Sequence, residues 1–134
     1  MSKQTIVKIV STLGAVIDVV TGTLLISAPQ QALEQIHAPA VSEPVLLQFI
    51  GVFILSIGLS YVIGLLSWWL TGSIARLRVV WEITLIFRLG AALFITFALL
   101  NQTVGFPWIR VPIVDFLFFI VQAALLRAQF LKES

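Results

Sequence analysis

Three ionisable side chains lie inside stretches of apolar residues, and they are the residues of this chain best placed to carry chemistry. Arg88 lies near the middle of the stretch 79–100, and Asp18 and Asp115 fall inside two other such stretches. A charge at the middle of a bilayer costs at least about 2.5 to 3.5 kcal/mol on insertion scales, so such groups face a partner or a cavity. The three residues therefore mark the place where a site or an internal ion pair is expected.

The three side chains are expected to meet. Counted along a helix from the end of each stretch that is taken as cytoplasmic, Thr5, Val79 or Arg127, the depths of Asp18, Arg88 and Asp115 are roughly 20, 14 and 18 Å, and helix tilt makes these depths overlap. In the favoured interpretation Arg88 forks between the two carboxylates and fastens three helices together; the alternative is a transport or binding site. With two acids and one arginine, the surplus carboxylate would hold a proton or be balanced by a bound cation.

A second polar layer is predicted about 5 to 9 Å from the same ends. Its members are Lys8, Tyr61, Glu82 and Gln122. Lys8 and Glu82 could pair across it. The favoured alternative is local: the amine of Lys8 reaches the headgroups, and Glu82 pairs with Arg78 one helical turn away.

Composition places the chain in a membrane and excludes several kinds of site. It is 60% hydrophobic and 10% charged, with mean hydropathy +1.10, whereas about a quarter of the residues of a soluble domain are charged. Without cysteine there is no disulfide, thiolate or iron–sulfur site, and the single His37 cannot supply a pair of haem ligands or a histidine-rich metal site. No metal site is predicted. Because the basic residues cluster at segment ends, neither is a nucleic-acid partner.

Four apolar segments are each long enough to span a bilayer, and they cover 5–27, 45–70, 79–100 and 108–130. They predict an all-α membrane protein: one domain, 1–134, folded as an up-down four-transmembrane-helix bundle. The long connection 28–43 is expected to hold a short interfacial helix on the outer surface, ending near Pro39. Ser27 to Gln30 resembles a capping box with proline in the first turn, and Ser42 to Pro44 could cap the second crossing.

The distribution of charge predicts the orientation. Apart from Arg88 inside its apolar stretch and Arg110 at the edge of the third connection, the basic residues lie at the N-terminus, the second connection or the C-terminus; they are Lys3, Lys8, Arg76, Arg78, Arg127 and Lys132. The positive-inside rule then places both termini in the cytoplasm. Three tryptophans, Trp68, Trp69 and Trp81, would form the cytoplasmic aromatic belt, and Trp108 would lie at the outer surface.

Small residues mark the faces on which helices are expected to pack closely. Gly14 and Gly22 flank Asp18 at four residues on either side, which turns that acid into the bundle. Ser56, Ser60 and Gly64 recur every four residues in the second segment. This second stripe predicts packing either within the bundle or between protomers.

Three strings resemble small bacterial four-helix membrane proteins of the DoxX-like group. They are Leu47-Gln-Phe-Ile-Gly-Val-Phe-Ile-Leu-Ser-Ile-Gly-Leu-Ser-Tyr61, Arg88-Leu-Gly-Ala-Ala and Val114-Asp115-Phe-Leu-Phe. The resemblance covers nearly the whole chain and implies the four-helix fold and a bacterial cytoplasmic (inner) membrane. Some members are linked to quinone-dependent oxidation or to larger membrane assemblies, and no catalytic residue carries over.

No catalytic constellation is found, so the chain is not expected to be an enzyme. The favoured function is that of a non-catalytic accessory or scaffolding subunit, in contact with lipid and with other membrane-protein subunits or itself. The alternative is a small carrier or binding protein for a proton-linked or lipophilic solute such as a quinone, using Asp18, Arg88 and Asp115. A third hypothesis is a redox partner with a quinone near Tyr61 and Glu82. No cofactor is predicted beyond such a ligand.

Overall fold

The computed structural model describes residues 2–128 and 130–131, and in this part of the chain it is helical without strands. The elements are α1 (Lys3–Ser27), α2 (Pro29–Gln35), α3 (Pro44–Thr71), α4 (Ala75–Leu100), the short 3-10 helix η1 (Phe106–Ile109) and α5 (Arg110–Arg127). The predicted all-α class is confirmed. The helices α1, α3, α4 and the continuous η1–α5 segment are long and apolar enough to span a membrane.

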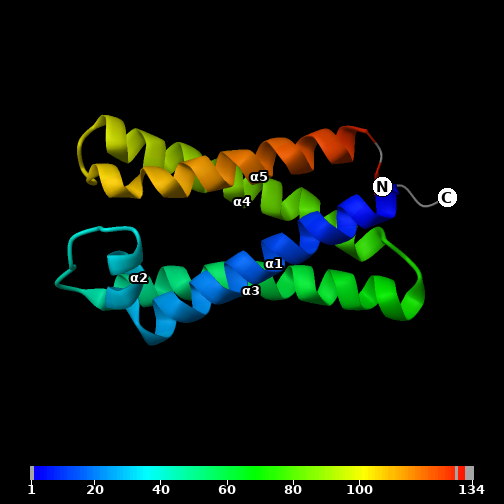
Figure 1. The fold of residues 1–134 in the computed structure, drawn as a ribbon, viewed down its shortest axis with the longest axis horizontal. Coiled ribbons are helices and arrows are strands. Elements are labelled where there is room, and N and C mark those ends of the chain that lie inside the picture. Colours follow the sequence, from blue (N-terminus) through cyan, green and yellow to red (C-terminus); the bar gives the residue numbers. More distant parts are fainter. Residues whose placement is uncertain (1, 129, 132–134) are drawn as a thin grey trace.

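The long helices form two hairpins (Figure 1). In the first, α1 packs along α3, and α2 lies in the connection between them; in the second, α4 lies beside α5. The start of α1, the end of α5 and the α3–α4 turn lie together at one end of the molecule, called here the terminal end. The connection through α2 and the α4–η1 connection lie at the other, the loop end.

Local signals explain where the helices begin and end. Ser2 caps α1 by accepting a hydrogen bond from the backbone N–H of Thr5 at 3.2 Å. At its far end α3 stops at Gly72, whose φ of 73° is a left-handed conformation that glycine adopts without a steric penalty. By contrast α4 begins four residues before the predicted start, because Arg76 and Arg78 are helical although they are not apolar.

Two of the predicted caps are not formed. The hydroxyl of Ser27 donates back to the carbonyl of Thr23 within α1, and neither α2 nor α3 has a side-chain cap. Pro29 and Pro44 do lie in the first turns of these helices, where a missing N–H costs nothing. The predicted segment 108–130 is instead η1, with Pro107, followed by α5, which ends at Arg127; residue 129 lies outside the described part.

The two helices of the first hairpin cross at glycines. A Cβ atom on Gly22 would lie 2.4 Å from the backbone nitrogen of Leu55, and one on Gly58 would lie 2.7 Å from that of Val19. No larger residue fits either position without moving a backbone. Gly14 is less tightly packed, since its Cβ would lie 3.4 Å from the ring of Tyr61.

The three small residues of the predicted stripe on α3 lie in different surroundings. Gly64 packs against Leu77 of α4, and a Cβ there would lie 2.9 Å from that side chain. Ser56 is exposed and Ser60 is half-buried, and each hydroxyl donates to a carbonyl of its own helix. The predicted packing within the bundle is therefore wrong for Ser56.

Two apolar cores hold the hairpins together, one toward each end. The core at the terminal end consists of Val7, Ala15, Tyr61, Ile74, Leu77, Trp81 and Leu131. The core at the loop end consists of Leu25, Leu33 and Leu47, with Trp108 packed against it. Trp81 is fully buried, so its predicted place in an interfacial belt is wrong, whereas Trp69 is 81% exposed at the terminal end.

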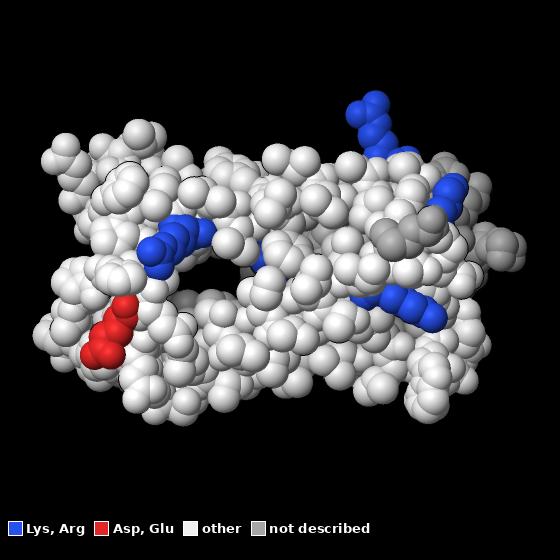
Figure 2. Space-filling view, viewed as in Figure 1, with Lys and Arg blue, Asp and Glu red and all other residues white. Residues whose placement is uncertain are grey.

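Between the hairpins, toward the loop end, the surface is hollowed (Figure 2). Beyond this hollow, the guanidinium of Arg110 donates to the backbone carbonyl of Gln35 at 2.9 Å and so links α5 to α2. The hairpins thus meet at both ends and leave a space between them.

Candidate functional site

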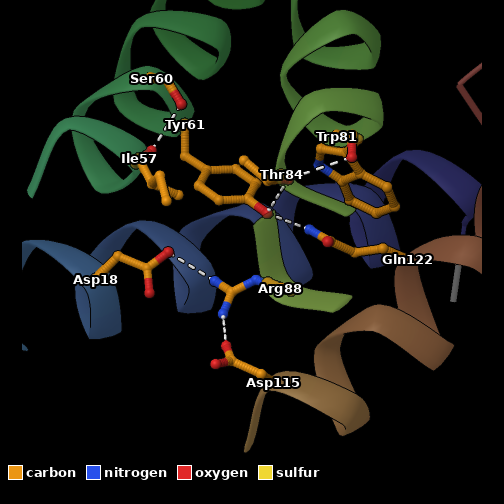
Figure 3. A network of polar contacts seen from close by, with 9 residues as sticks. All are labelled: Asp18, Ile57, Ser60, Tyr61, Trp81, Thr84, Arg88, Asp115 and Gln122. Atoms are coloured by element: carbon orange, nitrogen blue, oxygen red, sulfur yellow. Dashed lines mark hydrogen bonds and ion pairs between the residues drawn. The ribbon is translucent and has the colours of Figure 1, made fainter. Parts of the chain in front are cut away.

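The structure brings Asp18, Arg88 and Asp115 together in one ionic cluster (Figure 3). One terminal nitrogen of Arg88 donates to Asp18 Oδ2 at 2.6 Å, and the other donates to Asp115 Oδ1 at 2.9 Å. The three side chains are 5%, 10% and 17% exposed in the order Arg88, Asp18, Asp115. The arginine of α4 therefore fastens α1 and α5 at once, as the charge pattern predicted.

Asp18 lies on α1 in the first hairpin, whereas Arg88 and Asp115 lie on α4 and α5 in the second. A long side chain is therefore needed to reach Asp18. The flexible arm of Arg88 spans from one hairpin to the other, and its planar fork reaches two carboxylates at once. The ring of Phe118 lies beneath the guanidinium, with its centre 4.5 Å from Cζ. This cation–π contact adds a third attraction to the same charge.

The carboxylates are not fully used by the arginine. Each gives one oxygen to Arg88, and neither Asp18 Oδ1 nor Asp115 Oδ2 has a hydrogen-bond partner among the described residues. Neither of these two oxygens is completely buried. With both acids ionised, the cluster carries one negative charge more than its arginine neutralises.

A second, uncharged network lies next to the cluster on the side of the terminal end. The hydroxyl of Tyr61 accepts a hydrogen bond from Gln122 Nε2 and is bonded to the hydroxyl of Thr84 at 2.7 Å. Trp81 Nε1 donates to Ser11 Oγ at 2.9 Å. All five side chains are buried, and they come from α1, α3, α4 and α5.

The predicted second layer is thus only half present. Tyr61 and Gln122 belong to the buried network, but Lys8 and Glu82 are exposed. Lys8 Nζ lies 5.1 Å from the ring centre of Trp68, and Glu82 is bonded at 2.9 Å to Arg78 one turn before it. The structure therefore confirms the local alternative for Glu82, whereas Lys8 lies against Trp68 and does not pair with Glu82.

The prediction of this layer omitted Ser11 and Trp81, each seven residues before a member of the ionic cluster on its own helix. Thr84 precedes Arg88 by four residues. Spacings of four and seven place residues on one helix face, so the signal was present in the sequence. A serine or tryptophan on the face of a buried charge is a candidate member of its network.

Two buried polar atoms of this region lack a hydrogen-bond partner: Arg88 Nε, a donor, and Gln122 Oε1, an acceptor. Gln122 is completely buried, and Figure 3 shows its amide directed toward Tyr61 and the guanidinium side of the network. A buried group without a partner costs about 1 to 3 kcal/mol, so such atoms are expected to contact water or a ligand.

Other parts of the chain offer weaker candidates. Among residues 2–128 and 130–131 no three His, Asp or Glu side chains gather as they would around a metal ion. His37 is exposed in the connection after α2. A cavity of about 580 Å³ lies at the α4–η1 connection, lined by residues between 96 and 109, and none of the cluster residues borders it.

Comparison of the chain with family models, with curated proteins and with solved structures finds no match. The resemblance to the DoxX-like group therefore stays a prediction from the residues that carry it.

Proposed function

We propose that this chain is an integral membrane protein that crosses the bacterial cytoplasmic membrane four times, with both termini in the cytoplasm. The support is the four long apolar helices and the charge at their ends. Of the basic residues that the structure describes, Lys3, Lys8, Arg76, Arg78 and Arg127 belong to the terminal end, whereas Arg110 belongs to the loop end. This asymmetry is the positive-inside pattern.

Its proposed role is that of a non-catalytic accessory or scaffolding subunit of a larger membrane assembly. The observation that carries this proposal is how little of each helix the fold covers. In the most apolar 18-residue window, 28% of the residues are buried in α1 and only 11% in the segment Phe106–Arg127. The uncovered faces are apolar and include Phe94, Phe97, Ile113, Leu117 and Ile120. Such faces suit lipid and the helices of other subunits alike, and some members of the group it resembles are linked to larger assemblies.

In this role the ionic cluster is a structural link between helices. The hairpins are also linked by the uncharged network around Tyr61 and by Arg110 on Gln35, but the bond from Arg88 to Asp18 links them through opposite charges. An ion pair in an apolar region is strong only while both partners are present. Arg88 would hold α1 and α5 in fixed positions, so that the outer faces present a constant surface to other subunits.

The accessory role is tested by purification from native membranes in a mild detergent. A tag on the N-terminus leaves the helix faces free, and the sample is compared with one extracted in a harsher detergent. We expect fixed protein partners in the mild detergent, and we expect the harsher one to remove them. On a native gel the complex should have a larger apparent mass than the 14.8 kDa chain alone in its micelle. A monomer without partners, folded and equally monomeric after cross-linking in the intact membrane, would contradict the role.

A second candidate function is that of a carrier or binding protein for a lipophilic solute, and one specific observation favours it. The carboxylates of the ionic cluster keep free and partly exposed oxygens, and the surface between the hairpins is hollowed (Figure 2). Reconstituted vesicles should then bind or transport a solute in a way that Asp115→Asn abolishes. Glu82→Gln is the matched control, because Glu82 is exposed and, among the described residues, forms its ion pair with Arg78. Equal binding by the two variants would contradict this candidate.

Under this proposal a quinone is no longer expected near Tyr61 and Glu82. Tyr61 is fully buried and Glu82 is exposed, so these residues do not share one surface on which a quinone could lie. A quinone remains a proposed ligand only as one of the lipophilic solutes that could enter the hollow.

A further inference from the structure

We infer that the hollow between the hairpins binds an apolar molecule that carries one positively charged hydrogen-bond donor, such as an alkylammonium group, and that this charge completes the cluster of Asp18, Arg88 and Asp115. The inference rests on the second candidate function, the carrier or binding protein, and specifies the chemical class of its ligand. It is independent of the accessory role.

The balance of hydrogen bonds gives the first argument. Three acceptor atoms lack a donor: Asp18 Oδ1, Asp115 Oδ2 and Gln122 Oε1. Against them stands one donor without an acceptor, Arg88 Nε. The site is therefore short of donors. An ammonium group brings three donors and no acceptor, and a water bound with it can reach a neighbouring acceptor.

The balance of charge gives the second argument, and it selects among ligands. The cluster holds two carboxylates and one guanidinium, so a cationic group neutralises it while an anionic group would add to the like charge. A neutral quinone carbonyl offers only acceptors and could use only the single free donor. A phosphate or carboxylate headgroup is therefore excluded by its charge, and a quinone fits poorly.

Access gives the third argument. Toward the terminal end the cluster is closed by side chains that are fully buried, among them Tyr61, Trp81 and Gln122. On another side the cluster is more open, because Asp115 keeps the largest exposure of the three cluster residues, and the surface between the hairpins is hollowed toward the loop end (Figure 2). Next to the two acids on their helices, Ile17 and Val114 are exposed apolar residues. A ligand would thus arrive from the loop-end side, with its charge at the cluster and its chain among apolar surfaces.

The test measures binding of radiolabelled dodecylamine to the purified full chain in lipid nanodiscs, with empty nanodiscs giving the partitioning into lipid. Unlabelled dodecanol and dodecanoate compete in parallel, because they share the chain and differ in the headgroup. Ammonium chloride and potassium chloride form a further arm, which separates an organic cation from a free inorganic one. The variants are Asp115→Asn and Asp18→Asn, with Glu82→Gln as the control.

We expect saturable binding of dodecylamine that weakens roughly thirty-fold or more in Asp115→Asn and is unchanged in Glu82→Gln. Dodecanol and dodecanoate should compete poorly. Displacement by ammonium or potassium at comparable concentration would overturn the apolar ligand and assign the site to a free cation. Equal competition by dodecanol, or full affinity in both Asp variants, would overturn the inference.

If neither Asp variant folds, the headgroup competition on the unaltered chain still decides between a charged and a merely apolar site. The outcome is also separate from that of the functional proposals. Loss of dodecylamine binding with retained binding of another lipophilic solute would leave the carrier function standing, while copurification of subunits bears only on the accessory role.

Discussion

Arg88 links the two hairpins through a charged side chain and joins acids of two different helices. Its side chain is only 5% exposed and serves two acids, so its removal leaves two carboxylates close together without a counter-charge. Breaking a buried ion pair by removing one partner costs far more than replacing all its members by apolar groups. The cost of losing Arg88 should therefore lie mainly in what it leaves behind.

We predict that Arg88→Met lowers the free energy of unfolding by about 3 to 5 kcal/mol. The triple variant Asp18→Asn, Arg88→Met, Asp115→Asn should recover most of that loss, because it removes the unbalanced charges together with the arginine. Denaturation in detergent, followed by circular dichroism, measures both. Arg78→Met is the matched control: its ion pair with Glu82 is exposed, and such pairs contribute about 1 kcal/mol or less. A triple variant as unstable as Arg88→Met would show that the cluster does not act through its charge balance.

Sequence alone predicted the ionic cluster because a charge in an apolar stretch has few ways to be accommodated. It did not predict the second layer correctly, since depth along a helix does not say which face a residue occupies. Lys8 and Glu82 have nearly the depth of Tyr61 and Gln122 but lie on outer faces. Trp81 shows the opposite error. Its position near a helix end predicts an interfacial residue, but its ring packs in the core.

At the scale of the helices, the glycines of the first hairpin set the distance between α1 and α3. Gly51 and Gly58 are seven residues apart, so they share a face of α3, and each would place a Cβ within 3 Å of α1. The sequence-based stripe, at a spacing of four, selected Ser56 and Ser60 on a different face. Both spacings are compatible with a helix face, and only the position of α1 distinguishes them.

We predict that Gly58→Ala and Gly90→Ala change stability in opposite directions. A Cβ on Gly58 would lie 2.7 Å from a backbone nitrogen of α1, whereas one on Gly90 meets nothing within 4 Å. The first should lose about 1 to 3 kcal/mol through overpacking, and the second should gain up to about 1 kcal/mol through helix propensity. Thermal unfolding of the two variants in one detergent compares them directly. Equal effects would mean that α1 and α3 are not in contact at this glycine.

At the scale of the whole molecule, the number and order of the helices followed from hydropathy, but the space between the hairpins did not. The hollow depends on how the hairpins are set against each other, and that is determined by the two cores, by Arg110 on Gln35 and by the arm of Arg88. These contacts join residues about 70 positions apart in the chain, which no local pattern reports.

The orientation of the molecule is the prediction that belongs to this scale. The fold places the α3–α4 turn at the terminal end and α2 at the loop end, and the charge pattern assigns the terminal end to the cytoplasm. Because the chain has no cysteine, Ala75→Cys and Gln31→Cys each introduce a single thiol, and both positions are exposed. In intact cells a membrane-impermeant maleimide should label the cysteine at 31 and spare that at 75, and inverted vesicles should reverse the pattern. Ala92→Cys, fully buried, should react only after denaturation and so controls for access. Labelling of 31 and 75 from the same side would contradict the four crossings, while a complete reversal would keep the fold and invert its orientation.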